Sequence, residues 1–114
     1  MDTPDYFVKT HRLVISQDLP VLPSVLEEDF ESFFKAILEI DPHNCCNEVR
    51  CHCLVREPLV GFKAMEIRWK GIHYRLVYRI IEECKRVEIF SFDHHKPAYH
   101  KAEERVRTST GYRY

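Results

Sequence analysis

The stretch from residue 64 to residue 80 carries the side chains whose types and spacing could do chemistry. It reads Ala-Met-Glu-Ile-Arg-Trp-Lys-Gly-Ile-His-Tyr-Arg-Leu-Val-Tyr-Arg-Ile, which predicts two alternating strands around a glycine turn. Because side chains repeat every second residue in a strand, one face of this hairpin should carry Glu66, Arg68, Lys70 and Arg75. A carboxylate set among fixed cations suits the binding of a phosphodiester and the transfer of a proton on it.

The same pattern also has a purely structural interpretation, in which the charged face is solvated and its charges pair across the hairpin. Glu66 would then balance Arg75, and Arg79 would be one more cation on a strand exposed to solvent. The aromatic residues of these strands and of the next one are expected in the core: Trp69, Tyr74, Tyr78 and Phe90.

The elements that position this hairpin begin with a predicted strand and a helix. Residues 6–15 are rich in aromatic and β-branched side chains and predict a first strand, whereas residues 17–22 are a connector because they contain a proline. Pro23 stands where a helix begins, and Asp41-Pro42 ends it. Apolar side chains recur at helical spacing between these points: Leu26, Phe30, Phe33, Phe34, Ile37 and Leu38.

The second half of the chain predicts further strands and a final helix. Residues 49–55 form either a short strand or an extended loop. Strands are predicted at residues 64–70, 74–81 and 86–92, with a turn at residues 82–83, a polar loop at 93–97 and a helix at 99–106. Alternation in the last strand predicts that Val87, Ile89 and Ser91 face one way and that Glu88, Phe90 and Phe92 face the other.

These elements predict an α+β fold. It is a small antiparallel sheet of about four strands, with an N-terminal helical segment packed on one face and a short C-terminal helix. A chain of 114 residues is long enough to bury one modest core, so we expect a single domain at residues 1–107 and a flexible tail at residues 108–114.

Charge is distributed unevenly along the chain, although the formal net charge is only −1. Residues 1–60 hold 5 Lys and Arg against 11 Asp and Glu, a balance of −6, whereas residues 61–114 hold 12 against 7, a balance of +5. An anionic partner is therefore expected to meet the second half. The nearly neutral total argues against strong non-specific affinity for nucleic acid over the whole protein.

The sequence contains no sign of a membrane partner. No apolar run approaches the roughly 18 residues that span a bilayer. The N-terminal Met-Asp-Thr-Pro-Asp-Tyr lacks the basic and then apolar pattern of a signal peptide, so we expect a cytoplasmic protein.

Five cysteines in a short chain raise the question of a metal site. They are Cys45, Cys46, Cys51, Cys53 and Cys84, with His43 and His52 nearby. The adjacent pair and the Cys-x-Cys pair do not match the Cys-x2-Cys spacing that places two thiolates on one zinc ion. We therefore expect free thiols in a reducing compartment and no metal, with a zinc module as the weaker alternative.

Three segments of the second half form a recognisable set. They are Tyr74-Arg75-Leu76-Val77-Tyr78-Arg79-Ile80, a later strand ending Ile89-Phe90-Ser91-Phe92, and Ala98-Tyr99-x-x-Ala102-x-x-Arg105. This set resembles the RelE/ParE superfamily of toxins from bacterial toxin–antitoxin pairs. The resemblance covers about residues 6–106 in element order and is detailed at residues 64–80 and 87–105.

The resemblance implies roles for particular residues. In the RNA-cleaving branch of the superfamily, the strand before the Tyr-Arg-Leu-Val-Tyr motif carries basic residues that contact the scissile phosphate. Those places fall here on Glu66, Arg68 and Lys70, where Glu66 departs from the basic pattern but matches members that use a Glu as general base. The motif arginine, Arg75, would stabilise the transition-state phosphate, and Lys70 and Arg79 would bind substrate. The remaining catalytic candidates lie late in the chain: His94, His95 and Tyr99.

These residue types fit RNA cleavage. The RNA 2′-hydroxyl attacks the neighbouring phosphorus once Glu66 or a neutral histidine has accepted its proton. Arg68 and Arg75 would hold the phosphate as charge develops. His94 or His95 could protonate the leaving 5′-oxygen, and Tyr99 could stack on an unpaired base or orient the phosphate.

The resemblance therefore implies a toxin that cleaves mRNA on the translating ribosome and so inhibits translation, without a cofactor. Its partners would be a cognate antitoxin protein and ribosome-bound mRNA, with a homodimer also open. The alternative is a non-enzymatic member of the same fold, either a gyrase-inhibiting ParE-like protein or a degenerate protein that only binds its antitoxin.

Overall fold

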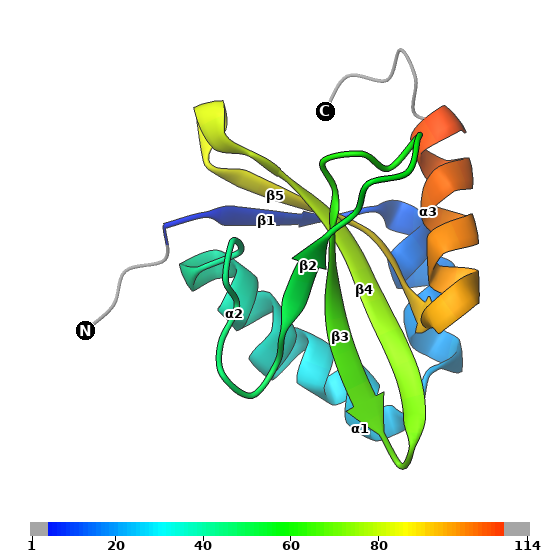
Figure 1. The fold of residues 1–114 in the computed structure, drawn as a ribbon. Helices are drawn as coiled ribbons and strands as arrows, with labels where there is room; N and C mark the ends of the chain where they lie inside the picture. The colour runs from blue at the N-terminus through cyan, green and yellow to red at the C-terminus, as the bar shows by residue number, and fades with distance from the viewer. Residues whose placement is uncertain (1–4, 109–114) are drawn as a thin grey trace.

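Five strands form one mixed sheet in the computed structural model, which describes residues 5–108 (Figure 1). The strands are β1 (Phe7–Thr10), β2 (Cys51–Cys53), β3 (Lys63–Trp69), β4 (Ile72–Ile81) and β5 (Arg86–His94). Their order across the sheet is β1-β5-β4-β3-β2. The α+β class is confirmed, and the uncertain stretch at residues 49–55 contributes the short edge strand β2.

The sheet is mixed rather than wholly antiparallel. Antiparallel pairs join β2 to β3, β3 to β4 and β4 to β5. In contrast, β1 pairs parallel to β5, with Phe7 opposite Arg86 and Thr10 opposite Ile89. The expectation of an antiparallel sheet of about four strands was therefore wrong for the first strand. Alternation identifies a strand but does not reveal the direction of a neighbour that lies about eighty residues away in the chain.

The helical segment between β1 and β2 consists of several short pieces. These are η1, a π-helical turn (Val14–Asp18), η2, a 3-10 turn (Leu19–Val21), α1 (Ser24–Asp29), η3, a second π-helical turn (Phe30–Phe34), and α2 (Lys35–Ile40). The helix predicted from Pro23 to Asp41 is confirmed. The first strand, predicted to reach Ile15, ends at Thr10, because Val14 and Asp18 turn inward and are completely buried.

Two apolar cores lie on opposite faces of the sheet. The larger one packs the sheet against α1, η3 and α2, where the Phe92 ring meets Phe30 at 6.0 Å and Phe34 at 5.8 Å between centroids. The smaller one packs the sheet against α3 (His95–Thr108) through Val77, Phe90, Ala98, Ala102, Leu59 and Phe62. No helix in residues 5–108 has the length and apolar character needed to cross a bilayer.

A β-bulge changes which side chains face α3. Val77 pairs with Ser91 but Tyr78 pairs with Ile89, so β5 contains one residue more than β4 at this point. The predicted alternation of β5 is consequently wrong after Ile89. Phe92 joins the larger core, whereas Ser91 turns to α3 and its hydroxyl donates to the Ala98 carbonyl at 2.7 Å.

The junction between β5 and α3 is ordered structure and not the polar loop predicted at residues 93–97. β5 continues through His94, and α3 begins at His95 and ends at Thr108. The helix is longer than predicted, and charged side chains anchor it to the sheet beneath. Lys101 Nζ contacts an Asp93 carboxylate oxygen at 2.6 Å. The predicted tail begins with a helical residue, and residues 109–114 lie outside the described part of the chain.

A buried ion network joins this helix to the start of the chain. The Asp18 carboxylate receives hydrogen bonds from both terminal nitrogens of Arg105, at 2.8 and 2.9 Å, and from the Phe92 backbone N–H at 3.0 Å. Lys101 Nζ contacts it at 3.3 Å. Asp18 is completely buried and Arg105 is 2% exposed, so the network holds η1, β5 and α3 together.

Candidate functional site

Glu66 and Arg75 stand directly opposite one another on the sheet face that α3 partly covers. β3 and β4 pair so that Glu66 lies across from Arg75 and Arg68 across from His73. Residues opposite each other in an antiparallel pair project from the same face. The predicted grouping of Glu66, Arg68 and Arg75 on one face is therefore confirmed by the register.

The Glu66 carboxylate is held by a histidine from the edge strand. His52 Nδ1 lies 2.7 Å from Glu66 Oε2, and the Glu66 backbone N–H donates to the Arg50 carbonyl at 2.7 Å. Partial burial tends to raise the pKa of Glu66, but the His52 hydrogen bond and the charges of His52, Arg75 and Arg50 outweigh it and lower that pKa. Glu66 is thus a fixed negative charge at neutral pH.

Arg75 keeps hydrogen-bonding capacity for a partner. Its Nη1 donates to the Tyr74 carbonyl at 3.0 Å, while its buried Nε has no acceptor within residues 5–108. Arg75 shares a hollow of about 420 Å³ with Glu66, Arg68, His73 and Arg50, and its wall also includes Glu48 and Ile67. Three guanidinium groups around one small hollow favour an anion such as phosphate, which guanidinium binds with two parallel hydrogen bonds.

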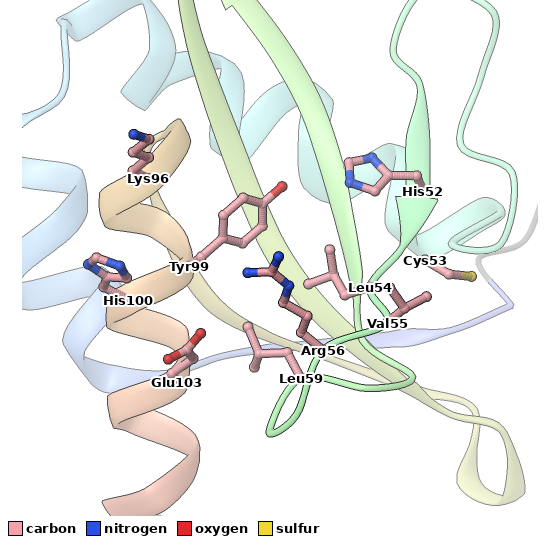
Figure 2. A pocket seen from close by; sticks show the side chains of 10 residues that line it. All are labelled: His52, Cys53, Leu54, Val55, Arg56, Leu59, Lys96, Tyr99, His100 and Glu103. Atoms are coloured by element: carbon pink, nitrogen blue, oxygen red, sulfur yellow. The ribbon is translucent and has the colours of Figure 1, made fainter.

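His95 and Tyr99 approach this site from α3. Their rings meet edge to face with centroids 5.3 Å apart. The loss of hydration at His95, together with the positive charges of Arg75, His73, Lys96 and His52, lowers the pKa of its ring. His95 is therefore neutral at neutral pH and suited to accept a proton. Figure 2 shows the Tyr99 ring reaching from α3 across the strands toward the side where His52 lies.

Three predicted site residues lie elsewhere. Lys70 is in the turn after β3 rather than on the charged face, with its ammonium 4.7 Å from the Trp69 ring centroid. His94 lies opposite Tyr74, on the face that carries the larger core, with ring centroids 4.9 Å apart. Arg79 pairs with buried Glu88 at 2.6 Å and lies over the Phe90 ring.

Sequence reasoning did not assign a role to three residues that the structure brings into the site: Arg50, His52 and His73. His52 was considered only as a neighbour of the cysteines. The available signal was alternation in Cys51-His52-Cys53, which places the histidine on the face opposite both thiols. Its pairing with Glu66 depends on contact between strands and is not visible in local sequence.

The cysteines do not gather into a metal site. Within residues 5–108, no group of three or more His, Cys, Asp or Glu side chains is placed to hold an ion. Burial, and then the neighbouring Cys51 thiol, raise the pKa of Cys45 to about 12, so this sulfur stays protonated. Its Sγ lies 3.5 Å from the buried Tyr78 hydroxyl, which donates to the Pro42 carbonyl at 2.7 Å.

Comparison with solved structures identifies relatives of this fold. The toxin–antitoxin complex RelBE2 from Mycobacterium tuberculosis contains a chain 31% identical to this one, with a TM-score of 0.58; the match covers 82% of this chain and 100% of that chain. A mutant of the E. coli toxin RelE in the free state is 22% identical, with a TM-score of 0.61 and coverage of 90% and 98%. The archaeal RelE–RelB complex from Pyrococcus horikoshii OT3 is 23% identical, with a TM-score of 0.56 and coverage of 82% and 99%.

No protein-family model matches the chain. No curated protein matches it. The two relatives below 25% identity share the fold. The match to the Mycobacterium tuberculosis complex extends over the full length of the compared chain and exceeds 30% identity. This chain therefore belongs to the RelE superfamily of toxins.

Proposed function

We propose that this protein is the toxin of a toxin–antitoxin pair and that it cleaves mRNA on the translating ribosome, without a metal ion. The observation that carries the proposal is the pairing of Glu66 with Arg75 on one sheet face. His52 is hydrogen-bonded to Glu66, and the charge of Arg75 contributes to the lowered pKa of His95. Carboxylate, guanidinium and imidazole groups together supply acid–base chemistry and phosphate binding.

His95 and His52 each take part in one of the two proton transfers. His95 is neutral, so it accepts the proton of the 2′-hydroxyl as that oxygen attacks the phosphorus. Glu66 bonds His52 Nδ1 and leaves Nε2 free to give a proton to the departing 5′-oxygen. This reverses the role first expected for His95, because its surroundings disfavour the charged ring that an acid requires.

The guanidinium groups stabilise the charge that develops on the phosphate. Arg75 has the central place because it is flanked by Glu66 on one strand and lies near His95 on the helix. Arg68 and Arg50 line the same hollow. Preorganised donors of this kind contribute about a hundredfold to a thousandfold each in enzymes that stabilise oxyanions.

Dependence on the ribosome fits the mixed charge of the protein. With a formal net charge of −1, its own field gathers RNA poorly. A ribosome that presents mRNA in a fixed position would supply both concentration and orientation. An antitoxin partner is supported by the relatives from Mycobacterium tuberculosis and Pyrococcus horikoshii, which are described as complexes of toxin with antitoxin.

A reconstituted assay tests this proposal. Purified protein is added to ribosomes programmed with a defined mRNA, and the cut position is mapped; a second mRNA then carries a single 2′-deoxynucleotide on the 5′ side of that cut. We expect cleavage of the first mRNA, a 2′,3′-cyclic phosphate on its product, and no cleavage at the modified position. Cleavage of both at equal rates would exclude the 2′-hydroxyl as the attacking group. No cleavage of either mRNA would favour the non-enzymatic, protein-binding alternative.

A further inference from the structure

A second cavity adjoins the catalytic hollow. It has a volume of about 650 Å³ and lies between α3 and the loop that joins β2 to β3, residues 54–62. His52 and Tyr99 line it, so it continues directly from the groups that would handle the phosphate. In Figure 1, this loop reaches across to α3. A cavity of this size is within the range that holds small organic ligands.

The cavity has an apolar wall and several polar side chains, which include the oppositely charged Arg56 and Glu103 as well as Lys96 and His100. Leu59 is 3% exposed and packs with Ala98 and Ala102 in the smaller core, and Leu54 packs beside it. Arg56, from the loop, and Glu103, from α3, both line the cavity (Figure 2). Within residues 5–108, neither the Arg56 nor the Glu103 side chain forms a hydrogen bond or an ion pair with another side chain, so the guanidinium and the carboxylate both remain available to a ligand.

We propose that this cavity holds one unpaired nucleobase of the RNA, next to the cleaved phosphate, and selects it by its hydrogen-bonding edge. The inference rests on the proposed RNA cleavage. Flat aromatic bases stack on tyrosine, which Tyr99 supplies, and their faces suit a wall of leucine. Each base also carries donors and acceptors on one edge, which Arg56 and Glu103 can meet.

A nucleobase fits the cavity better than a peptide side chain does. His52 lines this cavity and lies 2.7 Å from Glu66, which lines the hollow around Arg75, so a nucleotide that spans this pair can place its phosphate among the arginines and its base in the cavity. Arg56 and Glu103 come from different elements, whose spacing is fixed by the packing of Leu59 on α3. This cavity therefore reads sequence, whereas the hollow around Arg75 binds any phosphate.

The test compares cleavage sites across the transcriptome. Wild-type protein, Arg56→Gln and Glu103→Gln are expressed, and base frequencies beside each cut are counted by sequencing of RNA ends. The matched controls are Arg107→Gln and Glu104→Gln, two exposed residues of α3 outside the cavity. Thermal unfolding verifies that all variants are folded. We expect the wild type to prefer particular bases at one position beside the cut, and Arg56→Gln and Glu103→Gln to reduce that preference by about fivefold or more.

The outcomes separate this inference from the proposed function. Cleavage with a base preference that both cavity variants leave unchanged would overturn the inference, assign the cavity to a protein partner, and leave the nuclease standing. Complete loss of cleavage in both folded variants would also overturn it, because Arg56 and Glu103 would then serve the reaction and not the selection of bases. No cleavage by the wild type would overturn both proposals.

Discussion

At the scale of single residues, the site depends on Arg75 and on the carboxylate beside it. Alternation in residues 64–80 was enough to predict that Glu66, Arg68 and Arg75 share a face, because that stretch is one regular hairpin. Alternation did not predict the position of the Lys70 side chain, because Lys70 precedes Gly71 in the turn and has a φ of 51°. A left-handed residue leaves the strand geometry, so its side chain no longer follows the alternation.

The pairing of Glu66 with His52 predicts that substitution of either residue lowers the cleavage rate by a similar factor. Glu66→Gln and His52→Gln should each lower the rate of mRNA cleavage on programmed ribosomes by about a hundredfold or more, since both changes remove the positioned proton donor. The double variant should be little worse than either single variant, because the two residues act as one unit. Losses that multiply in the double variant would show independent roles.

The pH dependence of cleavage follows from His95. A lowered pKa keeps the ring neutral at neutral pH, and the ring gains a proton only as the pH falls through that lowered value. Cleavage measured from about pH 5 to pH 8 should therefore rise on the acid side and already be level at neutral pH. His95→Gln should be much slower and lack that acid limb. An acid limb in His95→Gln equal to that of the wild type would show that a group other than His95 accepts the proton.

At the scale of elements, the β-bulge and the start of α3 are the features that local patterns missed. The extra residue in β5 reverses the faces of Ser91 and Phe92 relative to strict alternation. A bulge depends on the partner strand, which alternation within one strand does not reveal. The helix could be predicted from residue 99 onward, but it is held to the end of β5 by the contact of Lys101 with Asp93, which joins two elements.

The Asp18 network predicts a large loss of stability from a small change. Asp18→Asn leaves the buried guanidinium of Arg105 without its counter-charge, which typically lowers the free energy of unfolding by about 3–5 kcal/mol. Urea unfolding measures this loss, with the exposed Asp5→Asn as the matched control. A loss for Asp18→Asn no larger than that of the control would show that the ion network does not hold η1, β5 and α3 together.

At the scale of the whole molecule, the two faces of the sheet differ in the charge of the side chains that they present. The acidic helical segment covers one face (Figure 1). The arginine-lined hollow lies on the other face, from which Glu66 and Arg75 project. The charge imbalance between the two halves of the sequence thus becomes an imbalance between the two faces. Composition indicated this division, although which cation contacts the substrate depends on the register of the strands.

This division predicts that the location of a charge matters more than the net charge. Glu27→Gln with Glu28→Gln, both exposed on α1, should leave ribosome-dependent cleavage within about twofold at physiological salt, because exposed charges beyond a Debye length are screened. Arg68→Gln removes one charge at the hollow and should slow cleavage by roughly tenfold or more. An effect of the α1 pair as large as that of Arg68→Gln would show that long-range charge governs the encounter.

The central claim is that Arg75 stabilises the phosphate during RNA cleavage. Primer extension on RNA from cells expressing the wild type, Arg75→Ala and the exposed control Arg12→Ala tests it most directly, with equal protein levels verified by immunoblot. We predict discrete cleavage sites for the wild type and Arg12→Ala and their absence for folded Arg75→Ala. The same sites at the same intensity in Arg75→Ala, or no sites in the wild type, would contradict the account.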